Sequence, residues 1–166
     1  MGGFSTLSLD LGSTFGWALG INGQIMRSGE LTLAPGASTM HPGHRWIKFQ
    51  EWLFQFKDVN EILYEDVMFF GKNGHKAARV YCGLLAVVQM FSLVHGIRVR
   101  CLSPSAVKSE FAGNGRADKF RICDVAINLG WQNGKRGTDV NHNEADAIAL
   151  MWVIFNRDKK CPRFAA

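Results

Sequence analysis

An acidic side chain lies within an apolar stretch near the start of the sequence, Thr6-Leu7-Ser8-Leu9-Asp10-Leu11-Gly12-Ser13. Its leucines alternate with small or polar residues, which is the period of two that a β-strand imposes. Two more strands are predicted directly after it, over 17–21 and 24–33, because Asn22-Gly23 is a strong two-residue hairpin signal. The chain therefore begins with a three-stranded meander that carries Asp10 on its first strand.

The rest of the chain alternates between helices and strands. Apolar residues recur at intervals of three and four over 45–56, which predicts an amphipathic helix. A meander followed by such an alternation predicts an α/β fold with a mixed sheet and packed helices. We expect residues 1–166 to form one domain, since the length suits one core and no linker is visible. The remaining predicted elements are strands over 62–67 and 97–102 and helices over 75–94, 103–108, 116–129 and 143–155.

Composition excludes several classes of protein. Hydrophobic residues make up 47% and charged residues 20%, which excludes disordered and fibrous chains. We expect no secretory signal and no membrane helix, because the longest apolar stretch, over 80–94, is interrupted by Gln89 and Ser92. The cysteines are far apart and form no C-x-x-C pair, so we expect reduced thiols in a cytoplasmic protein. They are Cys82, Cys101, Cys123 and Cys161.

The net charge of +5 is unevenly distributed along the chain. Residues 1–94 hold seven basic and seven acidic side chains, whereas residues 95–140 hold eight basic and four acidic ones. A mildly basic chain permits an anionic partner without requiring one. The basic segment therefore suggests one surface that faces a polyanion.

Three carboxylates lie in apolar surroundings. Asp10 is in the first strand, Glu65 ends the run at 62–64, and Asp146 interrupts the run at 145–150. Such a carboxylate is costly unless it is paired or bound to a cation. With the Asn143 oxygen, the three form a hard-oxygen site of the type that suits Mg²⁺ or Mn²⁺, and two such ions can promote phosphodiester hydrolysis.

Each carboxylate also has a structural alternative when it is considered alone. Asp10 could belong to a turn at the strand end, Glu65 to a solvated strand end, and Asp146 to a helix cap or salt bridge. Spacing in the sequence does not by itself bring the three together.

Four motifs are spread over roughly residues 5–155. They are Leu9-Asp10-Leu11-Gly12-Ser13-x-x-Gly16, Tyr64-Glu65-Asp66-Val67, residues 103–108 with 113–119, and Glu144-Ala145-Asp146-Ala147-Ile148-Ala149. In sequence and in order, they resemble the motifs of RuvC-type Holliday junction resolvases. The resemblance implies the RNase H-like fold, with a five-stranded mixed sheet and helices on both faces.

The resemblance also implies an activity. It implies a homodimeric endonuclease that nicks symmetric strands of four-way DNA junctions, with Asp10, Glu65 and Asp146 holding Mg²⁺ or Mn²⁺ ions. Lys108 and Lys119 match basic positions near the scissile phosphate, and we expect Lys119 to take part in catalysis. The alternative for either lysine is a solvated helix residue. The other expected DNA-binding residues are Phe69, Phe70, Lys72 and Arg116, the aromatic pair by stacking on bases unless it belongs to the core.

One position departs from the family pattern. The residue three before the last Asp is acidic in the family, or His in some members, and here it is Asn143, with His142 before it. Both share a helix face with Asp146, and Asp139 could substitute if the helix begins early. We expect a neutral Asn to bind a divalent ion more weakly. His142 could act as a general base or be an ordinary loop histidine.

Dimerisation has separate support in the sequence. The predicted helix over 75–94 is apolar on nearly all sides, so we expect it to be buried on both sides, with a two-fold partner helix covering one of them. The alternative is a central helix within one larger core.

Other functions remain open at this stage. Residues 10–14 also resemble the phosphate-binding turn of sugar kinases and actin-like ATPases, but those enzymes need two such domains. An RNase H-like nuclease acting on forks, flaps or hybrids, and a catalytically weakened junction-binding protein, are the remaining alternatives.

Overall fold

The computed structural model describes residues 3–33, 41, 43–68, 71, 74–131 and 141–160, which form a mixed five-stranded sheet with the order β3-β2-β1-β4-β5. The strands β3, β2 and β1 are antiparallel, and β1, β4 and β5 are parallel. The strands are β1 (Ser5–Asp10), β2 (Thr14–Ile21), β3 (Gln24–Thr32), β4 (Glu61–Glu65) and β5 (Arg98–Leu102). The helices are α1 (His44–Leu53), followed by the short η1 (Phe54–Phe56), α2 (His75–His95), α3 (Pro104–Ala112), α4 (Lys119–Asn128) and α5 (His142–Lys160).

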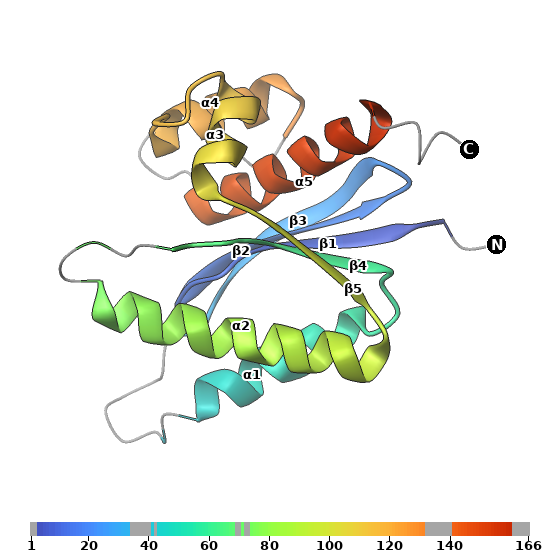
Figure 1. The fold of residues 1–166 in the computed structure, drawn as a ribbon, viewed down its shortest axis with the longest axis vertical. Helices are drawn as coiled ribbons and strands as arrows, with labels where there is room; N and C mark the ends of the chain where they lie inside the picture. The colour runs from blue at the N-terminus through green and yellow to red at the C-terminus, as the bar shows by residue number, and fades with distance from the viewer. Residues whose placement is uncertain are drawn as a thin grey trace.

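Helices cover both faces of this sheet. Figure 1 shows α1 and α2 on one face and α3, α4 and α5 on the other. Each face has its own cluster of buried apolar side chains. The predicted fold class, a five-stranded mixed sheet with helices on both faces, is confirmed.

Alternation along β1 separates the two cores. Leu7 and Leu9 are fully buried on the side of α1 and α2. Ser8 points to the opposite face, where its Oγ donates a hydrogen bond of 2.8 Å to the Ala147 carbonyl oxygen of α5. Because side chains two residues apart share a face, Asp10 also faces α5. The strand therefore carries its carboxylate toward the helix that carries Asp146.

Small residues on β2 let α5 approach the sheet closely. Gly16, Ala18 and Gly20 alternate along the strand on the face toward α5. A Cβ atom at Gly16 would collide with the Asn143 carbonyl group, and one at Gly20 would collide with the Phe155 ring. The first turn of α5 therefore lies directly on the backbone of β2.

Several boundaries differ from the sequence prediction: the helix predicted over 103–108 continues to Ala112, and the strand predicted over 17–21 begins at Thr14. Two further helix boundaries have a local cause. The helix predicted from residue 116 begins at Lys119, because the Asp118 side chain accepts a hydrogen bond of 2.8 Å from the Arg121 N–H and so caps it. The helix predicted to end at 155 continues to Lys160. The basic side chains in its last turn interact favourably with the negative end of the helix dipole and stabilise this extension. Both boundaries are therefore set by end effects rather than by apolar periodicity.

The helix α2 is long and apolar enough, by length and composition alone, to cross a membrane. The interrupted run over 80–94 did not predict this. In the fold, one side of α2 packs into the core through Tyr81, Leu84, Val88 and Phe91. Packing against the core therefore accounts for the apolar residues on this side of α2.

We predict that Gly16→Ala destabilises the protein by about 2 kcal/mol, because the new methyl group forces α5 away from β2. Thermal unfolding measures the effect, with Ser13→Ala, an exposed change in the preceding turn, as the control. Equal melting temperatures for the two variants would contradict the close packing of α5.

Candidate metal and nucleic-acid site

Asp10 and Glu65 lie side by side at one edge of the sheet. The parallel strands β1 and β4 pair Leu9 with Tyr64, so the next residue on each strand is a carboxylate. Because the two strands are parallel and in this register, their carboxyl ends lie at the same edge of the sheet. The carboxylates of the first two motifs therefore lie on neighbouring strands.

Asp146 reaches the same edge from the first turns of α5. The hydrogen bond from Ser8 fixes Ala147 over β1, and this places the neighbouring Asp146 near Asp10. The Asp146 charge in turn raises the pKa of both Asp10 and Glu65, which shows that the three carboxylates interact.

The three carboxylates are partly buried, and none makes a hydrogen bond or ion pair with another described residue. Desolvation and the Asp146 charge raise the pKa of Asp10 to about 7. Desolvation and the Asp10 charge raise the pKa of Glu65 to about 8. Desolvation also raises the pKa of Asp146. The site therefore disfavours its own negative charge.

A divalent cation is the partner that this donor set suits. Carboxylate oxygens are the ligands that Mg²⁺ and Mn²⁺ prefer, and a bound cation removes the repulsion between them. Within the described residues, no three His, Cys, Asp or Glu side chains lie close enough to enclose one ion as they stand. Repulsion between like charges keeps the carboxylates apart, so they must move closer together to bind one cation.

Lys108 on α3 and Lys119 at the start of α4 supply positive charge to the site. Both lower the pKa of Asp10 and of Asp146, and Lys108 also lowers that of Glu65. Neither lysine makes an ion pair with a described residue. The two lysines therefore lie near the carboxylates and remain available to an anion.

Asn143 and His142 take different positions on α5. The Asn143 Nδ2 donates a hydrogen bond of 2.7 Å to Glu30 Oε2 on β3. His142 packs against α4, with its Nδ1 3.4 Å from Cys123 Sγ and its ring edge-on to Phe120. Its charge lowers the pKa of Asp146, so it lies near the carboxylates as well.

Of the five remaining candidate residues, the structure describes one. Arg116 is exposed in the turn before α4, where its backbone N–H donates to Asn114 Oδ1. The remaining candidates lie outside the described residues; they are Phe69, Phe70 and Lys72, together with Asp139.

The basic segment at 95–140 does not form one surface. Arg98 and Arg100 both pair with the buried Glu61, and Arg100 also pairs with Asp158. Glu61 begins β4, whereas Glu65 ends it, so these arginines lie at the opposite edge of the sheet from the carboxylates. The expectation that the whole segment faces a polyanion is therefore wrong for its first two arginines.

Sequence reasoning missed a residue that supports Glu65. The Tyr81 hydroxyl on α2 donates a hydrogen bond of 2.7 Å to the Glu65 carbonyl oxygen and accepts one of 3.2 Å from the Val67 N–H. It thereby fixes the backbone where β4 ends. A buried tyrosine on an apolar helix was the available signal, because its hydroxyl needs a partner.

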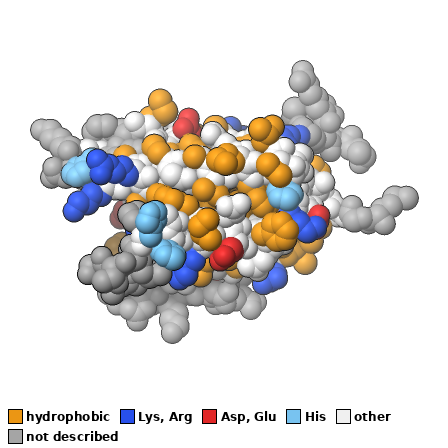
Figure 2. Space-filling view, turned by 90° about the horizontal axis from the view of Figure 1, so that it is seen from below, with side chains coloured by type: hydrophobic (Ala, Val, Ile, Leu, Met, Phe, Trp, Pro, Cys, Tyr) orange, Lys and Arg blue, Asp and Glu red, His pale blue; other side chains and the backbone are white. Residues whose placement is uncertain are grey.

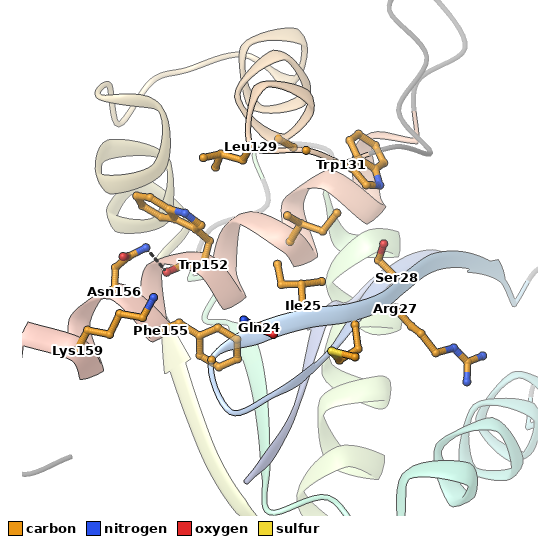
Figure 3. Close-up of a pocket in the computed structure, with 15 residues that line it drawn as sticks. Gln24, Ile25, Arg27, Ser28, Leu129, Trp131, Trp152, Phe155, Asn156 and Lys159 are labelled. Atoms are coloured by element: carbon orange, nitrogen blue, oxygen red, sulfur yellow. Dashed lines mark hydrogen bonds between the residues drawn. The ribbon is translucent and has the colours of Figure 1, made fainter. Parts of the chain in front are cut away.

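A cavity of about 580 Å³ lies elsewhere, between β3, α4 and α5. Figure 3 shows Trp152 and Phe155 from α5 facing Ile25 and Ser28 of β3 across it, with Trp131 at one end. None of the three carboxylates lines this cavity. The cavity and the carboxylate site are therefore separate.

Comparisons with known proteins identify the fold. No protein-family model and no curated protein sequence matches the chain. The structure is similar to that of Thermus thermophilus RuvC, with a TM-score of 0.68 and 19% identity over 94% of this chain and 96% of that one. It is also similar to T. thermophilus RuvC in complex with a Holliday junction substrate, with a TM-score of 0.69 and 19% identity over 93% and 94% of the two chains.

A third similar structure is the yeast mitochondrial Holliday junction resolvase Ydc2, with a TM-score of 0.69 and 15% identity over 95% of this chain and 81% of that one. The chain therefore has the RNase H-like fold of RuvC and Ydc2, as the motifs predicted.

The raised carboxylate pKa values predict a pH-dependent stability. Consider a carboxyl group whose pKa is higher in the folded protein than its value of about 4 in the unfolded protein. Its contribution to the stability of the fold is complete below about pH 4 and is lost as pH rises through the folded pKa. For Asp10 and Glu65 the loss ends near pH 7 and 8. With a chelator present, we expect the melting temperature to fall between about pH 5 and about pH 8 by roughly 5 °C more in the wild type than in Asp10→Asn.

The control for this measurement is Asp124→Asn, which removes an exposed carboxylate from α4. It should keep the wild-type dependence on pH. The same dependence in Asp10→Asn would contradict the electrostatic account of the site.

Proposed function

We propose that this protein is a divalent-metal-dependent endonuclease that cuts four-way DNA junctions as a homodimer. The observation that carries the proposal is the set of three carboxylates without hydrogen-bond partners among the described residues, flanked by Lys108 and Lys119, on the fold of known resolvases.

The proposed roles follow from position. Asp10, Glu65 and Asp146, with the Asn143 oxygen, hold Mg²⁺ or Mn²⁺, and two ions are expected. When bound, these ions supply activation of the attacking water and stabilisation of the leaving oxygen. Lys119 adds positive charge on the side of α4, where it stabilises charge that develops on the scissile phosphate.

Other side chains hold the DNA. Lys108 and Arg116 contact phosphates beside the reacting one, and we expect this binding to weaken steeply with salt. Phe69, Phe70 and Lys72 follow Glu65 by four to seven residues in the chain. The proposed role of the aromatic pair is to stack on bases at the branch point.

A second copy of the chain is the proposed partner for the outer face of α2. Met90, Leu93 and Val94 are 68%, 86% and 78% exposed on this face, and Phe54 of η1 beside them is 55% exposed. Figure 2 shows apolar side chains spread over the face that α1 and α2 form. A hollow of about 130 Å³ lies between the two helices, next to Met90 and Val94. A two-fold pairing of α2 helices would cover this surface.

A junction-binding protein without cleavage is the second candidate. Asn143 favours it, because a neutral ligand binds a divalent ion less strongly than a carboxylate. An RNase H-like nuclease for forks, flaps or hybrids uses the same carboxylates, so substrate choice separates it from a resolvase.

We predict that the wild type nicks a labelled four-way junction in Mg²⁺ or Mn²⁺ but not in EDTA, and in preference to a flap, an RNA–DNA hybrid or a plain duplex. Asp146→Asn should lower cleavage by at least about 100-fold while junction binding in a gel-shift assay survives, because the lost carboxylate holds metal and not phosphate. Asp58→Asn removes an exposed carboxylate beside Lys57 and is the matched control.

The outcomes separate the candidates. Junction binding without metal-dependent nicking would support the binding-only protein, and preferential cutting of a flap or hybrid would support the other nuclease. Full cleavage by Asp146→Asn would contradict the proposed site.

We predict that Leu93→Glu converts the protein to a monomer at micromolar concentration, because burying an unpaired carboxylate in an apolar interface is costly. Sedimentation velocity measures the change. Leu129→Glu places the same charge at a residue that is 54% exposed after α4 and should leave the dimer intact. A monomeric wild type would rule out the dimer.

A further inference from the structure

Glu30 lies across the sheet from the carboxylate site. The strand register pairs Asp10 with Gly16 on β2 and Gly16 with Glu30 on β3, so the three residues form one row. With strands about 4.8 Å apart, the row spans about 10 Å between its outer Cα atoms. The Glu30 charge contributes to the raised pKa of Asp10, which places this side chain within electrostatic reach of the site.

Asn143 lies over the middle of this row. The Asn143 backbone carbonyl group lies so close to Gly16 that a Cβ atom there would collide with it. Its side chain turns toward the outer strand, where Nδ2 donates to Glu30 Oε2 over 2.7 Å. An ionised carboxylate only accepts hydrogen bonds, so this contact determines which end of the amide is nitrogen. The amide oxygen Oδ1 therefore lies on the end away from this bond.

A second hydrogen bond beside the first holds the same turn of α5. Ser28, two residues before Glu30 on the same face of β3, donates from Oγ to Glu144 Oε1 over 2.6 Å. The Trp131 Nε1 donates to the same oxygen over 3.0 Å. The edge strand thus holds two consecutive residues of α5, which leaves the Asn143 side chain little freedom to turn over.

We infer that Glu30 is a positioning residue for Asn143, whose amide N–H it binds so that the amide oxygen is presented to the cation held by the three carboxylates. The inference rests on the proposed function, because it assumes that Asp10, Glu65 and Asp146 bind a divalent cation. It also explains the neutral residue at this position: an Asp in place of Asn143 would face Glu30 as a like charge.

The test measures Mn²⁺ binding to the full-length protein, without DNA, by isothermal titration calorimetry. Glu30→Gln should weaken Mn²⁺ binding by about tenfold. A Gln side chain can either accept from the Asn143 N–H or donate to the Asn143 Oδ1, so it no longer fixes the orientation of the amide. Glu51→Gln neutralises an exposed carboxylate of α1, on the other face of the sheet, and should bind Mn²⁺ like the wild type.

A double variant separates positioning from a merely structural role. Asn143→Ala removes the amide oxygen, so Glu30→Gln should weaken Mn²⁺ binding no further in that background, whereas a simple loss of charge near the site would weaken it equally in both backgrounds. Thermal unfolding of each variant is measured in parallel. A lower melting temperature for Glu30→Gln with unchanged Mn²⁺ affinity, or an equal loss of affinity with and without Asn143, would overturn the positioning role.

The same titration distinguishes this inference from the proposed function. Wild-type Mn²⁺ binding that Glu30→Gln leaves unchanged overturns the inference alone. A wild type that binds no Mn²⁺ overturns the proposed metal site and the inference with it.

Discussion

Repulsion among three carboxylates that share one sheet edge is the constraint on which the rest of the structure depends. Asp10, Glu65 and Asp146 come from β1, β4 and α5. Burial raises the pKa of all three, and repulsion from neighbouring carboxylates raises the pKa of Asp10 and Glu65 further. Folding brings them together only because other contacts outweigh this cost. Those contacts are the close approach of α5 to Gly16 and the hydrogen bond from Ser8 to α5. A cation bound between the carboxylates would offset this repulsion.

The two faces of the sheet are used differently. The face under α5 carries the carboxylates at one edge, and Glu61 with its two arginines at the other edge ties β4, β5 and α5 together. The face under α1 and α2 is an apolar core, and beyond it α2 exposes a second apolar surface. Pairing of two chains through α2 would leave both carboxylate sites open, which is what paired nicks on one junction require.

The sequence predicted the order of the elements, because apolar periodicity and turn residues are local signals. Spacing in the sequence left open whether Asp10 and Glu65 meet, and only the family resemblance implied a shared site; the parallel register of β1 and β4 now places them on neighbouring strands. Contacts between distant segments were not predictable. Glu30 reads as an ordinary residue of an exposed strand until its pairing across Gly16 is known. Charge counts likewise assigned Arg98 to a DNA surface, because they could not show Glu61 beneath it.

A divalent cation at the carboxylate edge is tested most directly by anomalous diffraction from crystals grown with Mn²⁺. We expect an anomalous peak bounded by Asp10, Glu65 and Asp146, with the Asn143 oxygen turned toward it. Occupied Mn²⁺ sites elsewhere and no peak at this edge would contradict the proposed metal site.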